Sequence, residues 1–170
     1  SKKRPLMVVS NHISVFEIAT FPFAFKGSFI AKKEINSVPI LNLWMRKLYC
    51  LFLDRSNIRA GLDTILKAIE QVKQGVSIFI FPEGTRSKNG NVMGEFHHGS
   101  FRCATTAKCP VLPICVIDTH KVLDQKGSKP ITVQLHYLKP ILPEEYKGMK
   151  TNQLAELVQS RIQECIDANT

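Results

Sequence analysis

The feature that most constrains the fold is an alternation of short apolar runs with segments of helical periodicity. Six runs have the length and composition of β-strands: residues 6–10, 28–31, 50–53, 76–81, 111–117 and 131–138, of which the last alternates as a half-exposed strand does. Helices are expected between and after them, over residues 16–25, 41–48, 58–74, 99–108 and 154–166. The clearest helix runs from Ile58 to Val72 and is stopped by Gly75. This order predicts an α/β fold with a mostly parallel mixed sheet flanked by helices.

Length and composition fit one globular domain. The chain has 170 residues, of which 44% are hydrophobic and 22% are charged, as in ordinary soluble domains. The sequence contains no repeat, low-complexity tract or linker, and no run approaches the ~18 apolar residues of a spanning helix. We therefore expect a single domain over residues 1–170.

The cysteines favour a reducing compartment. Their number is odd, their spacing is wide, and no C-x-x-C motif occurs: Cys50, Cys103, Cys109, Cys115 and Cys165. A disulfide framework or a zinc ribbon is therefore not expected.

The charge balance predicts an anionic partner. Lys and Arg number 23 against 14 Asp and Glu, which gives a formal net charge of +9. A nucleic acid, a phosphorylated metabolite or an acidic membrane face would fit, and a merely solvated surface is the alternative. Because the basic residues are scattered and no aromatic platform accompanies them, we do not expect nucleic-acid binding.

Polar clusters follow three of the expected strands. Asn11-His12 comes after the first, Asp54-Arg55 after the third, and residues 83–86 after the fourth. In an open α/β sheet, ligands bind in the crevice beyond the carboxyl ends of the strands. The three clusters together therefore predict a binding site at that edge.

His12 and Glu17 form a candidate acid–base pair. A neutral imidazole can accept a proton near pH 7, and a carboxylate on its other nitrogen fixes its tautomer. Residues five apart on a helix are turned by roughly 140°, so the pair requires a non-helical turn. A solvated loop histidine beside an unrelated glutamate is the alternative.

Residues 81–87 have the composition of a phosphate-binding turn. Gly84 permits close backbone approach, Thr85 and Ser87 offer hydroxyls, and Arg86 offers a planar fork. Asp54-Arg55 could be a second phosphate-positioning pair. For both, the alternative is a turn or a surface salt bridge with solvated charges.

Other chemistries lack their signatures. His97-His98 has no third metal ligand at a sensible spacing, and Ser100 lacks the G-x-S-x-G context of a nucleophile. The P-loop and the G-x-G-x-x-G motif are also absent from the sequence. We expect neither a metal nor a bound cofactor.

Taken in order, these blocks resemble the 1-acylglycerol-3-phosphate acyltransferase family of glycerolipid acyltransferases. The N-H-x4-D block is similar to residues 11–17, where Glu17 replaces the usual Asp. The F-P-E-G-T-R-S block is complete at residues 81–87. The other similar segments are residues 31–35, 38–39, 51–55, 99–101 and 111–116. The resemblance covers about residues 6–118.

The resemblance implies a glycerolipid acyltransferase-like fold and a reaction. A fatty acyl group would pass from a thioester, acyl-CoA or acyl-carrier protein, to the hydroxyl of 1-acylglycerol-3-phosphate, giving phosphatidic acid. His12 would act as general base, held by Glu17, with no acyl-enzyme. The residues implied in substrate binding are Lys32, Asp54, Arg55, Glu83, Gly84, Thr85 and Arg86. Candidates for an acyl groove, or alternatively ordinary core residues, are Phe16, Phe21 and Phe23.

The resemblance also implies a location and two alternatives. We expect membrane association at the cytoplasmic face, contact with anionic headgroups, and a missing N-terminal anchor before the first block. Another lysophospholipid acceptor is one alternative. A catalytically weak lipid-binding homologue is the other, since Glu17 stands where Asp is usual.

Overall fold

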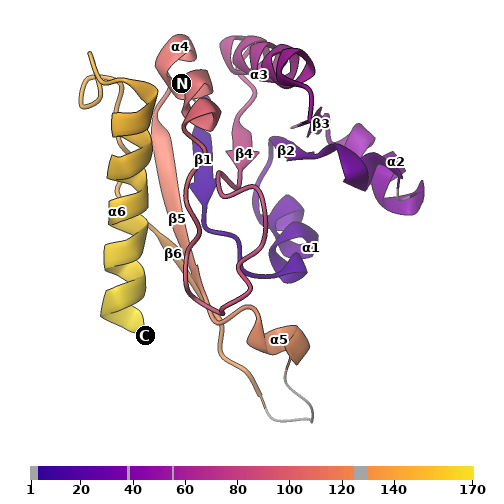
Figure 1. The fold of residues 1–170 in the computed structure, drawn as a ribbon, viewed down its shortest axis with the longest axis vertical. Coiled ribbons are helices and arrows are strands. Elements are labelled where there is room, and N and C mark those ends of the chain that lie inside the picture. The colour runs from indigo at the N-terminus through magenta and orange to yellow at the C-terminus, as the bar shows by residue number, and fades with distance from the viewer. Residues whose placement is uncertain (1–3, 38, 55, 125–129) are drawn as a thin grey trace.

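A computed structural model describes residues 4–37, 39–54, 56–124 and 130–170, and its core is one six-stranded sheet (Figure 1). The strands are β1 (Met7–Ser10), β2 (Ser28–Lys32), β3 (Leu51–Leu53), β4 (Ile78–Ile80), β5 (Val111–Ile117) and β6 (Gln134–Tyr137). Their order in the sheet is β3-β2-β4-β1-β5-β6. Only β6 pairs antiparallel, with β5, while the other neighbours are parallel. The predicted α/β class with a mostly parallel mixed sheet is confirmed.

The helices follow the predicted order, with two additions. They are α1 (Val15–Ala24), α2 (Pro39–Lys47), α3 (Ile58–Lys73), α4 (Arg102–Ala107), α5 (Lys121–Asp124) and α6 (Thr151–Asn169). Two 3₁₀ helices, η1 (Lys33–Ser37) and η2 (His98–Phe101), complete the set. The sequence did not predict η1 or α5, because single short turns are too brief to show helical periodicity.

The core lies on both faces of the sheet because strand side chains alternate between them. Met7 and Val9 of β1 pack in one cluster with residues of α3, α4 and α6. Val8, between them, packs in a second cluster with Phe21 of α1 and Met45 of α2. Figure 1 shows α6 along one side of the sheet and α1 and α2 on the other. The central strand β1 is therefore buried on both faces, as expected of a parallel sheet.

The chain order opens a crevice between two neighbouring strands. β1 leads into α1 on one face, whereas β4 leads toward η2 and α4 on the opposite face. Such a reversal leaves room at the carboxyl ends of the strands, where ligands bind in folds of this kind. The segments that follow β1 and β4, residues 11–14 and 81–86, lie at this place.

No helix in the described ranges has both the length and the hydropathy that crossing a bilayer requires.

Candidate active site

His12 and Glu17 are hydrogen-bonded in the structure. The His12 Nδ1 atom lies 2.8 Å from Glu17 Oε2. Both residues are buried, with exposed fractions of 7% and 1%. Residues 11–14 are irregular and α1 begins at Val15, so the turn between them is the non-helical one that the pairing requires.

The start of α1 explains why the Glu17 carboxylate turns back toward His12. Ser14 is the N-cap, and its side chain accepts a hydrogen bond from Phe16 N at 3.2 Å. In return, the Glu17 carboxylate accepts from Ser14 N at 2.8 Å, which completes a capping box. The same carboxylate thus caps the helix and holds the imidazole. The S-x-x-E pattern in the sequence was the signal that could have predicted this geometry.

A third residue, Thr119, completes this cluster from a distant part of the chain. Its hydroxyl donates a hydrogen bond to Glu17 Oε1 across 102 residues of sequence. Thr119 follows β5 and is 4% exposed. Sequence reasoning missed this residue, because a single threonine after a strand carries no signal.

The imidazole is also held by its ring face and by its backbone. The ring stacks on Phe81, with centroids 4.1 Å apart and planes inclined by 22°. The His12 carbonyl accepts from Ser87 N at 2.8 Å. Residues 81–87 therefore contact His12 directly, although they lie about 70 positions away in the sequence.

Glu83 holds the backbone rather than lining the pocket. Its two carboxylate oxygens accept from His12 N and from Gly94 N, each at 2.7 Å. Burial raises the pKa of Glu83 to about 7, and the two backbone hydrogen bonds only partly oppose that effect. Glu83, which we expected among the substrate-binding residues, instead ties the His12 turn to the segment around Gly94.

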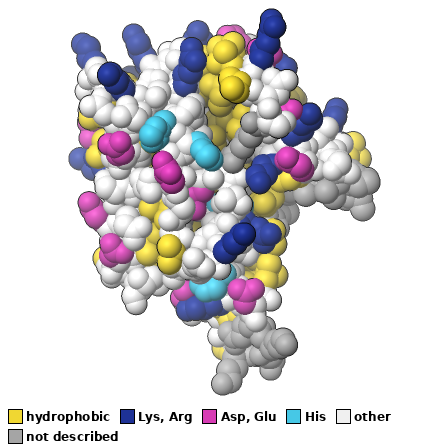
Figure 2. All heavy atoms as spheres, viewed as in Figure 1, with side chains coloured by type: hydrophobic (Ala, Val, Ile, Leu, Met, Phe, Trp, Pro, Cys, Tyr) yellow, Lys and Arg dark blue, Asp and Glu magenta, His cyan; other side chains and the backbone are white. Residues whose placement is uncertain are grey.

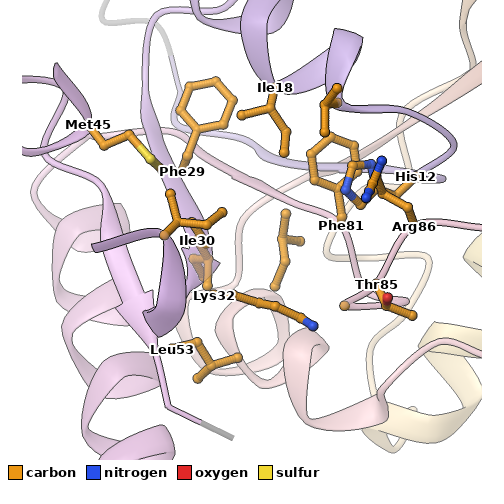
Figure 3. A pocket seen from close by; sticks show the side chains of 15 residues that line it. His12, Ile18, Phe29, Ile30, Lys32, Met45, Leu53, Phe81, Thr85 and Arg86 are labelled. Atoms are coloured by element: carbon orange, nitrogen blue, oxygen red, sulfur yellow. The ribbon is translucent and has the colours of Figure 1, made fainter. Parts of the chain in front are cut away.

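A pocket of about 320 Å³ opens beside His12 (Figure 3). His12, Phe81, Thr85 and Arg86 lie on one side of it. The other side is apolar and comprises Ile18, Phe29, Ile30 and Met45. The pocket thus pairs a reactive, polar wall with one suited to a hydrocarbon chain.

Two cations belong to this pocket. Lys32, at the end of β2, extends into it, and the exposed Arg86 lies next to His12 in the lining (Figure 3). Gly84 also lines the pocket, with φ of +67°, a conformation that residues with a Cβ rarely adopt. Of the expected substrate-binding residues, Lys32, Gly84, Thr85 and Arg86 are therefore brought together with His12.

Asp54 lies elsewhere. Its carboxylate pairs with Lys33 Nζ at 2.8 Å and accepts from the Ser56 hydroxyl. These contacts hold the pKa of Asp54 at about 2. Asp54 lines a second hollow of about 520 Å³, and Leu53 borders both hollows. Arg55, its expected partner, lies outside the described residues.

Two of the three expected acyl-groove phenylalanines, Phe16 and Phe21, do not line the pocket. Phe21 is buried in the core with Val8 and Phe79, and Phe16 is not among the lining residues. The side chain of Phe23 lies outside the described part. The apolar wall comes instead from strand and helix residues such as Phe29 and Met45, whose place in the sequence does not distinguish them from core residues.

Cys103 and Cys109 are buried in the core and do not line this pocket. Burial raises the pKa of Cys103 to about 12 and that of Cys109 to about 11, so both favour the thiol form. In the described ranges, no three His, Cys, Asp or Glu side chains are grouped so as to bind a metal ion.

Comparison with known families shows which family the chain belongs to. The sequence model of a family described as acyltransferase matches residues 1–117. The chain belongs to the acyltransferase family. The match covers every residue of the pocket, and it contains the His12–Glu17 pair and the F-P-E-G-T-R-S block.

Two curated acyltransferases and one crystal structure are similar along nearly the whole chain. The 1-acyl-sn-glycerol-3-phosphate acyltransferase LPAT1 of Arabidopsis thaliana is 33% identical over 98% of this chain and 46% of its own length. A 1-acyl-sn-glycerol-3-phosphate acyltransferase of Saccharomyces cerevisiae is 31% identical over 94% of this chain and 55% of its own. The crystal structure of the acyltransferase PlsC of Thermotoga maritima matches with a TM-score of 0.80 and 31% identity, covering 99% of this chain and 67% of that one. The chain spans about half the length of the curated acyltransferases it matches.

Proposed function

We propose that this acyltransferase transfers a fatty acyl group from a thioester to the free hydroxyl of 1-acylglycerol-3-phosphate, yielding phosphatidic acid. The observation that carries the proposal is the His12–Glu17 pair in a pocket that also holds Lys32, Arg86 and an apolar wall. The matching proteins named 1-acyl-sn-glycerol-3-phosphate acyltransferase support the same choice of substrate.

His12 is the general base in this proposal. With Glu17 ionised, Nδ1 carries the ring proton and donates a hydrogen bond to Oε2, which lies 2.8 Å away. The Nε2 atom is then left to accept a proton from the substrate. Proton transfer of this kind typically contributes ~10²–10⁴-fold to the rate.

The acyl group moves in one direct attack. His12 Nε2 removes the proton of the acceptor hydroxyl as its oxygen attacks the thioester carbonyl carbon. When the tetrahedral intermediate collapses, the C–S bond breaks and the new ester remains. The leaving thiolate takes the proton from His12, which returns to its neutral form.

Lys32 and Arg86 bind the phosphate of the acceptor. Both are exposed cations in the lining of the pocket that contains His12. Arginine suits phosphate through its planar fork of donors, and lysine acts as a point charge. Both cations therefore favour an acceptor with a terminal phosphate, whose hydroxyl would then lie near His12.

An anionic membrane surface supplies the acceptor. Figure 2 shows Lys and Arg side chains standing along the edge where Figure 1 places α3 and α4, with hydrophobic side chains between them. On α3, the hydrophobic residues Ile58, Leu62 and Leu66 are exposed at four-residue intervals, beside the exposed cations Arg59 and Lys67. A surface that combines exposed apolar and basic side chains suits an interface of anionic lipids.

An acyl-transfer assay with an acceptor panel tests the proposal. Purified protein is given acyl-CoA or acyl-carrier protein and either 1-acylglycerol-3-phosphate or a lysophospholipid whose phosphate carries a headgroup. We expect transfer to the phosphate-terminated acceptor, and we expect Arg86→Ala to raise its KM. Preference for the headgroup-bearing acceptor would favour the alternative substrate, and no transfer to either would favour a lipid-binding homologue.

A further inference from the structure

We propose that Thr119 is a positioning residue for the reaction proposed above, on which this inference rests. It acts through Glu17. Its hydroxyl fixes the carboxylate so that the His12 imidazole keeps one orientation toward the pocket.

The hydrogen bonds of Glu17 divide between near and distant donors. Oε2 accepts from His12 Nδ1 at 2.8 Å and from Ser14 N at 2.8 Å, both within the same turn. Oε1 accepts from Ser14 N at 3.0 Å and from the Thr119 hydroxyl. In the described part of the chain, Thr119 is the one donor to Glu17 that lies outside this turn. It therefore anchors the turn to the end of β5.

The segment that carries Thr119 is itself held in place. The preceding residue, Asp118, has φ of +67°, which is unusual for a residue with a side chain. Asp118 exchanges two hydrogen bonds of 2.9 Å with the Asn91 side chain and pairs with Lys121 at 2.7 Å. The hydroxyl is thus presented by a constrained turn, which is what a positioning role requires.

The length of the Glu17 side chain makes this contact possible. The carboxylate reaches His12 with one oxygen and Thr119 with the other while it caps α1. An aspartate is shorter by one methylene group, so it could not span the same two partners without a shift of the turn. Thr119 is therefore the partner that lets a glutamate orient the imidazole at this position.

Replacement of the hydroxyl tests the role directly. We expect Thr119→Val to lower kcat by roughly tenfold, because a hydrogen bond to a charged group is lost, while KM for both substrates stays within about twofold. Thr119→Ser, which keeps a hydroxyl, should recover most of kcat. Thr64→Val is the matched control, since Thr64 is also buried and hydrogen-bonded but lies in α3. An unchanged kcat in Thr119→Val, or a Thr119→Ser as poor as Thr119→Val, would overturn the proposal.

A double-mutant cycle tests whether Thr119 acts through Glu17. If it does, Thr119→Val should change kcat by less than about twofold in the Glu17→Asp background, because the contact is already lost there. An equal loss in both backgrounds would show that Thr119 acts by another route. Thr119→Ala serves in the same cycle if the valine variant does not fold.

Nuclear magnetic resonance separates this proposal from the proposed function. In protein with ¹⁵N-labelled histidine, the Hδ1 proton of His12 should exchange with water faster in Thr119→Val than in the native protein or Thr64→Val. An inactive native protein with this exchange difference would refute the proposed reaction but keep Thr119 as the residue that positions His12. An active native protein without the difference would refute the role of Thr119 alone.

Discussion

At the scale of single residues, two buried glutamates hold His12 in different ways. Glu17 binds the ring through Nδ1, whereas Glu83 binds the backbone through His12 N. With Phe81 stacked on the ring, the imidazole is held by an edge contact and a face contact, while Glu83 holds its backbone. Orientation of this kind lets a general base work without reorganisation at the moment of reaction.

Loss of the imidazole should abolish the chemistry. We expect His12→Ala to lower kcat by ~10²–10⁴-fold, because the proposed base is removed while the cations proposed to bind the phosphate remain. Circular dichroism and thermal unfolding check that the fold is kept, and steady-state kinetics measure the loss. A variant with native kcat would exclude His12 as the base.

The raised pKa of Glu83 should make stability depend on pH. A carboxyl whose pKa rises from 4.5 to about 7 on folding binds more protons in the folded state, so its contribution is full below pH 4.5 and declines as pH rises through about 7. The loss amounts to about 3 kcal/mol at most. The glutamine side chain of Glu83→Gln cannot titrate, so this variant should lack the pH-dependent contribution of Glu83 to the free energy of unfolding.

Urea unfolding at pH 5 and pH 8 measures the effect. The free-energy difference between the native protein and Glu83→Gln should be larger at pH 5 than at pH 8. A constant difference would mean that Glu83 is ionised across this range.

At the scale of elements, the ends of the strands and the start of α1 decide the site. Asn11 follows β1, and its side chain donates to the Val116 carbonyl and accepts from Val116 N, both at 2.8 Å. The amide thus continues the pairing of β1 with β5 after β1 has ended. It fixes the point at which His12 leaves the sheet.

Removal of this amide should be costly. Asn11→Ala would leave the buried N–H and C=O groups of Val116 unsatisfied, which we expect to lower the free energy of unfolding by about 2–4 kcal/mol. Asn169→Ala, at the exposed end of α6, is the control and should cost less than about 1 kcal/mol. Equal costs in chemical denaturation would contradict the bridging role of Asn11.

The elements were largely predictable from the sequence, but some contacts of the site were not. Buried strands such as 111–117 and the periodic helix from Ile58 were recognisable because hydrophobic spacing differs between strand and helix. The pairing of His12 with Glu17 could be predicted, because an imidazole and a carboxylate form an acid–base pair and only a local turn separates them. Thr119 and the backbone role of Glu83 did not, because contacts across 102 and 71 residues depend on which strands become neighbours.

At the scale of the whole molecule, the order of the strands in the sheet brings residues of separate sequence motifs together around one pocket. β1 and β4 are neighbours although about 70 residues separate them, and β2 lies on the other side of β4. His12, Arg86 and Lys32 therefore line one pocket at the carboxyl ends of three adjacent strands. Sequence motifs alone predicted a common edge but not this order, since all the inner strands are similarly apolar.

Membrane binding should depend on both charge and the exposed side of α3. With a net charge of +9, the protein should bind vesicles of phosphatidylglycerol more tightly than vesicles of phosphatidylcholine, and added salt should weaken the binding. Replacing Leu62 and Leu66 together by serine should weaken binding by at least about tenfold, because apolar burial in the interface is lost.

Co-sedimentation with vesicles measures both effects. Leu142→Ser is the control, because Leu142 is similarly exposed but lies outside α3. Equal binding by the α3 variant and the control would rule out this side of α3 as the contact.

The central place of β1 has a consequence for synthesis in the cell. Met7–Ser10 is synthesised before the other strands of the sheet, yet its two partners are Ile78–Ile80 and Val111–Ile114. At ~5–20 residues per second, the second partner appears roughly 5–20 s later. During the whole of that interval the edge of β1 that pairs with β5 has no native neighbour. We expect chaperones at the ribosome to bind this segment, and we expect the site around His12 to form only after β5 has emerged.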